Sequence, residues 1–207
     1  RDQYLALASE QDNSSLAVGL TKAKQAISEH EYGIAYDTLT DLRKSYPENP
    51  VLLNLLKTSY AKLELWQPLL ELLPHLKKQD LVEFDEFETL KLASQSGKMK
   101  DIASQKGVDG LIKHWDSLSK KEKQNSQLIA CFAELLIERQ ADKTAFTVLK
   151  ESTKKSNSPD LFLLFPKLKL KDRYPVIRYL EATVKKTTNS AEIFSALAQV
   201  QMKEELW

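Results

Sequence analysis

The chain has 207 residues, of which 42% are apolar and 29% charged, and its formal net charge is +1. This composition excludes a collagen, a disulfide scaffold and a disordered charged tail, and the balanced charge argues against a uniformly basic nucleic-acid binder. Only five residues are glycine. Because sheets joined by tight turns usually need more glycine, we predict an all-α protein.

A leading helix is predicted over residues 1–15, and a repeat pattern with a period of about 34 residues starts at Leu16. Ala23 and Ala35 provide small side chains at positions 8 and 20 of the first unit, where its two helices would touch. Pro47 at position 32 would stop the second helix, since proline cannot continue it.

The second unit starts one repeat period later, at Pro50. An apolar stripe typical of the first helix falls at positions 4, 7 and 11, which are Leu53, Leu56 and Tyr60. Lys57 and Leu69 occupy positions 8 and 20, where small residues are preferred, so this unit is degenerate. Residues 16–83 therefore resemble two tetratricopeptide repeats, each a pair of antiparallel helices.

The middle of the chain is less regular. A helix over residues 81–96 is expected to end near Gly97, and residues 84–125 form an irregular helical connection. Residues 126–159 read as a degenerate third repeat with the apolar pattern Ile129, Phe132, Ala133, Leu136, Ala145 and Leu149.

A helical segment is predicted over residues 160–190, and residues 191–207 read as the first helix of a truncated repeat, with Phe194, Leu197 and Ala198 on its apolar face. The fold class that follows is an all-α, tetratricopeptide-like array of antiparallel helical hairpins (an α-solenoid) with an irregular middle. The chain starts at Arg1 rather than methionine and stops at Trp207 within a helical pattern, as expected of a piece of a longer protein.

Four motifs occur in a specific order: Arg1-Asp-Gln-Tyr-Leu, Trp66-Gln-Pro-Leu-Leu-Glu-Leu-Leu-Pro, Gly110-Leu-Ile-Lys-His-Trp-Asp-Ser-Leu-Ser-Lys and Leu163-Leu-Phe-Pro-Lys-Leu. Their order and spacing over the whole chain resemble the C-terminal, repeat-bearing part of the proteobacterial HemY family. An unrelated flavin-dependent oxidase shares that name, but it needs a G-x-G-x-x-G turn, which the five glycines of this chain cannot form.

The resemblance implies a protein anchored in the bacterial inner membrane by two N-terminal helices that this chain lacks, with the present part on the cytoplasmic side. It also implies a role beside haem-biosynthesis enzymes such as ferrochelatase. We therefore expect a non-enzymatic scaffold that assists a late step of haem (protohaem) formation. A carrier of haem or porphyrin and a generic peptide-binding adaptor are the alternatives.

Tetratricopeptide arrays bind partners through the concave face of their first helices. In this chain the corresponding positions predict a partner groove that includes Leu20, Lys24, Ile27, Asn54, Thr58 and Lys62. Asn54 and Lys62 resemble part of a clamp for a terminal carboxylate, but Leu20 replaces a polar residue of that clamp. An apolar and polar groove for a partner helix or extended peptide fits better.

The charge is unevenly distributed. Residues 1–100 carry 12 basic and 15 acidic side chains, whereas residues 143–186 carry 11 basic and 4 acidic ones. The second stretch contains a predicted basic face of Lys167, Lys169, Lys171, Arg173 and Arg178. It would face anionic lipid headgroups, an acidic partner or porphyrin propionates, or it is an ordinary solvated surface. Nucleic acid is not expected, because aromatic side chains do not interleave with these cations.

Catalytic and metal sites are not predicted. Cys131 is the one cysteine, on an apolar helical face where an inert thiol is expected, and the three histidines lack zinc-binding spacing. The acidic residues near Glu83 are explained by a helix start rather than by acid–base chemistry. No cofactor is required; if haem is bound, His114 beside Trp115 is the candidate axial ligand.

Overall fold

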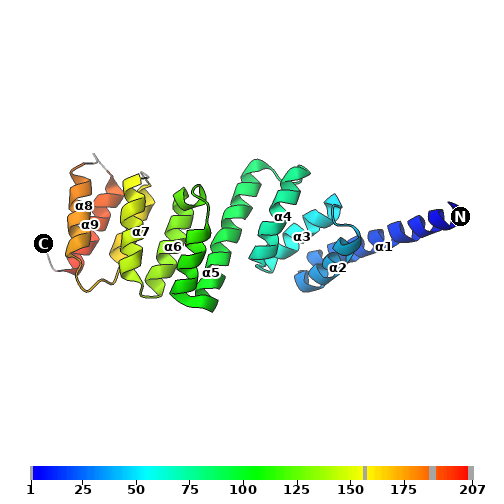
Figure 1. Cartoon of the computed structure of the whole chain (residues 1–207), viewed down its shortest axis with the longest axis horizontal. Coiled ribbons are helices and arrows are strands. Elements are labelled where there is room, and N and C mark those ends of the chain that lie inside the picture. The colour runs from blue at the N-terminus through cyan, green and yellow to red at the C-terminus, as the bar shows by residue number, and fades with distance from the viewer. Residues whose placement is uncertain (1, 156–157, 187–189, 205–207) are drawn as a thin grey trace. The chain divides into compact units, whose positions relative to one another are not determined.

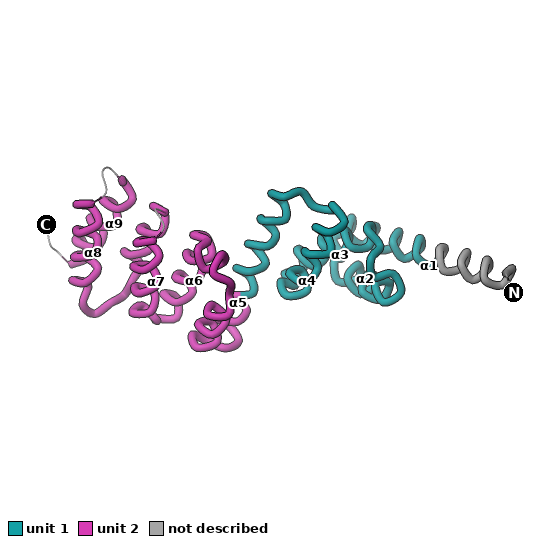
Figure 2. The backbone as a smooth tube through the Cα atoms, turned by 45° about the horizontal axis from the view of Figure 1, so that its top comes forward, with its two compact units in different colours: residues 1–98 teal, residues 99–207 magenta. Residues whose placement is uncertain are grey.

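The computed structural model describes the backbone of residues 2–155, 158–186 and 190–204, and side chains from Ser15 onward. Within these residues every regular element is a helix, which confirms the predicted all-α class (Figure 1). The chain forms two compact units, residues 1–98 and 99–207 (Figure 2). The long helix α5 (Phe84–Ser117) contributes residues to both.

Unit 1 contains four helices that pack on their neighbours in chain order, α1 (Asp2–Ser28), α2 (Tyr32–Ser45), α3 (Pro50–Lys62) and α4 (Trp66–Lys78). The beginning of α5 packs on the same core.

The predicted leading helix and the first helix of the first repeat form the single helix α1. Ala23 and Ala35 are fully buried between α1 and α2, where their small side chains allow close approach. Leu53, Leu56 and Leu69 are fully buried as well, so the predicted stripes form the core of unit 1.

Left-handed residues close the turns that follow the first helices of the predicted repeats. His30 has a φ of 62° and Glu64 a φ of 55°, and these two residues are one repeat period apart. Each lies just before a backbone N–H that bonds five residues back: Glu31 N to Ala26 O at 2.8 Å, and Leu65 N to Tyr60 O at 2.9 Å. This is the Schellman arrangement usually associated with glycine. The fold thus makes recurrent tight helix ends with few glycines.

Gly97 does not end a helix, contrary to the expectation from the sequence. It is buried in the middle of α5, which continues to a kink at Gly107, where φ is 62° and ψ is −159°. A Cβ at position 97 would overlap the indole of Trp66. The glycine therefore provides room for the side chain from α4 rather than a helix stop.

A polar cluster joins the turn before α3 to the end of α4. His75 Nδ1 lies 3.0 Å from Glu48 Oε1, and Gln79 Nε2 donates to Glu48 Oε2 at 2.9 Å and to the Glu48 carbonyl oxygen at 3.1 Å. The hydrogen bond from the Gln79 side chain, with help from His75, lowers the pKa of Glu48 from its ordinary value. The folded state therefore favours the ionised carboxylate.

This lowered pKa predicts a pH-dependent contribution to stability. It is present above the ordinary glutamate pKa and is lost as the pH falls through the lower pKa of the folded protein. We expect Glu48→Gln, which keeps the shape of the side chain, to lower the urea midpoint of unfolding near pH 7, and the difference from wild type to shrink steadily as the pH is lowered below the ordinary glutamate pKa. A difference that stays constant between these pH values would show that the ionisation of Glu48 does not stabilise the fold.

Unit 2 contains the end of α5, a short 3₁₀ turn η1 (Glu122–Gln124), α6 (Ser126–Glu138), α7 (Asp142–Lys155), the 3₁₀ segment η2 (Pro159–Lys167), α8 (Tyr174–Val184) and α9 (Ala191–Lys203). The packed pair of α6 and α7 buries the pattern predicted for the third repeat. Segment η2 packs on α6, α7 and α9, and its side chains Leu161, Phe162, Leu164 and Phe165 are buried. It supplies the centre of this core.

Helix α9 buries a different face from the one predicted. Ile193, Ala196 and Val200 are buried, whereas half of Phe194 is exposed and Ala198 is also exposed. Helix α9 packs against η2 and α8, and these contacts select the stripe one residue earlier than the repeat register. None of the described helices combines the length and apolarity needed to cross a bilayer.

Candidate functional site

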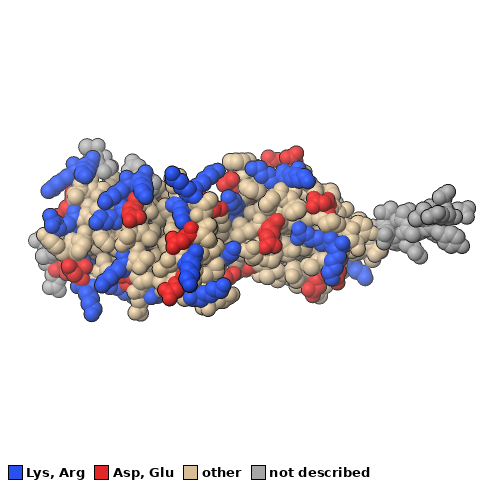
Figure 3. Space-filling model, viewed as in Figure 1, with Lys and Arg blue, Asp and Glu red and all other residues tan. Residues whose placement is uncertain are grey.

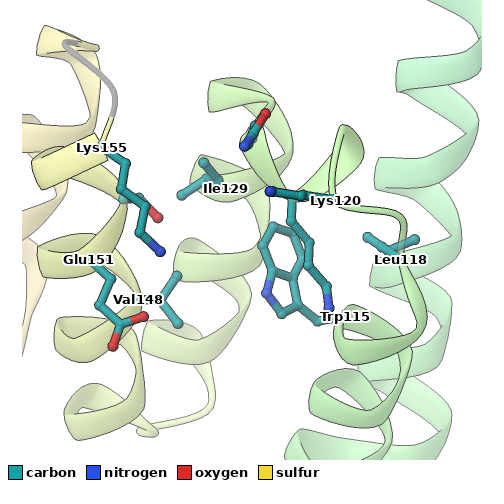
Figure 4. A pocket seen from close by; sticks show the side chains of 10 residues that line it. Trp115, Leu118, Lys120, Ile129, Val148, Glu151 and Lys155 are labelled. Atoms are coloured by element: carbon teal, nitrogen blue, oxygen red, sulfur yellow. The ribbon is translucent and has the colours of Figure 1, made fainter.

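The described part of unit 2 contains a cavity of about 680 Å³ between the end of α5, the η1 turn, α6 and α7. Its apolar lining consists of Trp115 and Leu118 from the end of α5 and the residues after it, Ile129 from α6 and Val148 from α7. Val148 and Ile129 stand between Lys155 and Glu151 on one side and Trp115 and Lys120 on the other (Figure 4).

The indole of Trp115 is held in place by its neighbour Phe132. The two rings stack with centroids 4.3 Å apart and an interplanar angle of 4°. Phe132 itself is only 1% exposed, in the middle of α6. Because the phenylalanine is fixed by the core, the indole at the cavity wall is fixed as well.

The turn that carries the cationic side of the cavity is shaped by a capping box. Glu122 accepts hydrogen bonds from Ser119 N at 2.9 Å and Ser119 Oγ at 2.7 Å, and Glu122 N lies 3.3 Å from Ser119 Oγ. Asn125 then caps α6 by accepting from Gln127 N and Leu128 N. These local bonds hold Lys120 and Lys123 at the cavity.

The charges around the cavity are mostly positive. Lys120, Lys123 and Lys155 line it together with one acidic residue, Glu151. Lys123 Nζ donates to the Asp116 carbonyl oxygen at 2.7 Å, which ties η1 to the end of α5. The arrangement suits an apolar body with a negatively charged group.

The predicted partner groove is divided between two helices of unit 1. Leu20, Lys24 and Ile27 lie on α1, and Asn54, Thr58 and Lys62 lie on α3, which contacts α1. Lys24, Asn54 and Lys62 are exposed, whereas Leu20 and Ile27 are half-buried against the core. Thr58 Oγ1 donates to the Asn54 carbonyl oxygen at 3.3 Å. The exposed part of the predicted groove is therefore polar, and its role as a binding surface stays a prediction.

Unit 1 contains a hollow of its own, of about 620 Å³, between α1 and α2. Its described lining includes Val18, Lys22, Asp41 and Tyr46, and none of the six residues predicted for the groove. Its surface is open and mixed in polarity.

The predicted basic face is partly neutralised by the fold. Lys167 pairs with Glu134 at 2.8 Å, and Arg173 pairs with Glu204 at 2.9 Å. Arg178 lies over the ring of Tyr174, 5.7 Å from its centroid. On the face shown in Figure 3, the lysines and arginines of unit 2 are interspersed with acidic side chains.

Like Lys167 and Arg178, Lys169 and Lys171 are exposed. The segment that carries them is anchored by Asp142, which is only 6% exposed and accepts a hydrogen bond from Lys169 N at 2.8 Å. A role for these lysines in binding stays a prediction.

His114 is half-buried in the last turns of α5, and its carbonyl oxygen accepts a hydrogen bond from Ser117 Oγ. It precedes Trp115 but is not among the described residues that line the cavity. The described residues also contain no group of three or more histidine, cysteine or acidic side chains placed to hold a metal ion. The role of His114 as a haem ligand stays a prediction.

No protein-family model matches the chain. The chain is 25% identical to "Protein HemY" of Escherichia coli K12 over 207 residues, which is 100% of this chain and 52% of that protein, and the same values apply to "Protein HemY" of Shigella flexneri. This similarity confirms the resemblance read from the motifs. The chain spans about half the length of the curated relatives it matches.

Among solved structures, the chain is similar to a thermophilic tetratricopeptide (TPR) protein of Thermus thermophilus. The TM-score is 0.37 and the identity 14%, with 90% of this chain and 98% of that chain covered.

Proposed function

We propose that this HemY-like helical protein is a non-enzymatic interaction scaffold that assists a late step of haem biosynthesis at the bacterial inner membrane. The observation that carries the proposal is the similarity to HemY over the whole chain, together with helical hairpins packed in sequence. In this role the full-length protein is tethered to the membrane and gathers pathway enzymes, among them ferrochelatase, on its cytoplasmic side.

The mechanism of such a scaffold is effective concentration. When two enzymes are held close together, a poorly soluble porphyrin passes between them locally instead of diffusing through the medium. The chain's own contribution is to offer binding surfaces on helices whose packing fixes their spacing. The exposed polar residues of α1 and α3 are the candidate surface in unit 1.

A double substitution on α3 tests the predicted partner groove. Asn54 and Lys62 are both exposed on α3, so Asn54→Ala with Lys62→Glu leaves the core of unit 1 intact. We expect this change to reduce the capture of ferrochelatase by the full-length protein about tenfold, because it removes polar contacts and reverses a charge. The amount of ferrochelatase recovered per bait, measured by quantitative mass spectrometry, is the readout.

Lys100→Glu is a suitable control for the groove experiment, because Lys100 is an exposed lysine of unit 2 outside the groove. It should leave capture unchanged. If the groove variant captured as much ferrochelatase as wild type while both variants kept their helicity, the partner groove would be assigned to the wrong surface.

The basic face would orient the scaffold. Lys169 and Lys171 remain exposed and available to anionic headgroups, each contributing about 1 kcal/mol near a lipid surface. We expect the chain to co-sediment with anionic vesicles in a salt-sensitive manner. The variant Lys169→Glu/Lys171→Glu should lose this binding. If that variant co-sedimented with the vesicles as strongly as wild type, this face would have no role in membrane binding.

A further inference from the structure

The unit 2 cavity has the size of a small-molecule site and is partly open to solvent. Its volume of about 680 Å³ lies within the range of about 300–1,000 Å³ that is usual for ligand pockets. The residues that line it come from α5, the η1 turn, α6 and α7. Four consecutive elements of the chain therefore converge on one hollow within a single compact unit.

One part of the cavity lining is apolar and firmly held. Ile129 is 2% exposed, and Trp115 is stacked on the buried ring of Phe132. Val148 lies opposite Trp115 across the cavity (Figure 4). Displacement of water from such a surface by an apolar body is favourable, because it removes apolar area from water.

The other part of the lining carries lysines from two separate segments of the chain. Lys120 belongs to the segment between α5 and η1, and Lys155 is the last residue of α7. Lys123 lines the cavity as well, so three lysines and one acidic residue, Glu151, give the lining a formal charge of +2. A single anionic group between the two sides would accept charge-assisted hydrogen bonds, which are stronger than neutral ones.

We propose that this cavity binds a small amphiphilic organic anion. The apolar body of the ligand lies against Trp115 and Val148, and its carboxylate, sulfonate or phosphate lies between Lys120 and Lys155. The described lining of the cavity includes none of the six partner-groove residues. The proposal therefore stands independently of the scaffold function.

The test uses the full chain and two probes, 8-anilinonaphthalene-1-sulfonate, whose fluorescence rises in apolar sites, and sodium laurate as a competitor. We expect saturable binding of one sulfonate probe per chain and its displacement by laurate. Lys120→Glu/Lys155→Glu should weaken both probes at least about tenfold, because it turns attraction into repulsion. Dodecyltrimethylammonium, which has the opposite charge, should not displace the probe.

The matched control is Lys113→Glu/Lys143→Glu. These exposed lysines lie on α5 and α7, two of the helices that form the cavity, but are not among its described lining residues. The control makes the same change in net charge and should leave the dissociation constants within about twofold of wild type, since isolated surface charges contribute little. Far-ultraviolet circular dichroism verifies that both variants are folded.

A second measurement avoids substitution altogether. Laurate should slow the acetylation of Lys120 and Lys155 by N-hydroxysuccinimide acetate, followed by mass spectrometry, and should leave Lys113 and Lys143 unaffected. Absence of probe binding, equal displacement by the cationic detergent, or acetylation of Lys120 and Lys155 unchanged by laurate would each overturn the proposal.

Discussion

Replacing Phe132 with alanine is expected to destabilise unit 2 by about 3–5 kcal/mol, the usual cost of removing a buried phenylalanine ring. Phe132 is 1% exposed, and its ring stacks on Trp115 at 4.3 Å. The substitution leaves a void in α6 and removes the support of the indole that lines the cavity. The free energy of unfolding in urea, followed by circular dichroism, gives the magnitude, and hydrogen exchange of the α6 and α7 amides assigns the loss to unit 2.

Phe132→Leu is the control for this prediction. It keeps most of the apolar volume but not the aromatic stack, so the expected cost is only about 1–1.5 kcal/mol. A loss below about 1 kcal/mol for the alanine variant would mean that the site relaxes around the void, and that Phe132 is not a central core residue.

Gly97→Val is expected to cost unit 1 about 1–3 kcal/mol, because α5 and the indole of Trp66 cannot both keep their positions. Three atoms of the indole, Cε2, Cδ2 and Nε1, occupy the space that a Cβ at residue 97 would need. Either α5 moves away or the indole swings toward water. The urea midpoint and a red shift of tryptophan emission measure the two consequences.

Gly33→Ala provides the matching control in the same unit. Gly33 is helical in α2 and exposed, and a Cβ there would meet nothing within 4 Å. This change should leave the stability unchanged or raise it by less than about 0.5 kcal/mol, because Gly33 lies in the first turn of α2, outside the helix interior where alanine has its full advantage over glycine. Equal effects of the two substitutions would contradict the close contact between Gly97 and Trp66.

The helical hairpins were predictable from the sequence because small residues recur where two helices touch. Ala23 with Ala35, and Ala133 with Ala145, have the same spacing within their units, and all four are fully buried. Spacing of this kind is a property of the sequence alone. The turns that join the helices are not visible in the same way, because His30 and Glu64 adopt left-handed geometry without being glycine.

The sequence-based predictions that differ from the structure concern features that are set by tertiary contacts. Glycine often occupies a helix end, so the sequence predicts one near Gly97, but the role of Gly97 depends on Trp66, which lies on the preceding helix, α4. The register of α9 is set by contacts with η2 and α8. A 3₁₀ segment such as η2 has no strong periodic signal, so its place in the core of unit 2 was not predictable either.

The candidate sites differ in the same way: the exposed groove positions could be predicted from the sequence, and the unit 2 cavity could not. The exposure of Lys24 on α1, and of Asn54 and Lys62 on α3, follows from the repeat register. The unit 2 cavity cannot be predicted from the sequence, because its lining residues from α5, α6 and α7 become neighbours only when these helices pack. The sequence carried one signal, the Ser119–Glu122 capping box, which fixes the turn before α6 but does not reveal the hollow beside it.

The central claim is that this chain is part of a scaffold for late haem-pathway enzymes. Affinity capture of the full-length, membrane-anchored protein from cells, followed by quantitative mass spectrometry, tests it most directly. The scaffold account predicts that ferrochelatase or a neighbouring pathway enzyme is enriched over a capture with an unrelated membrane-anchored bait. Recovery of the full-length protein with none of these enzymes enriched would contradict it.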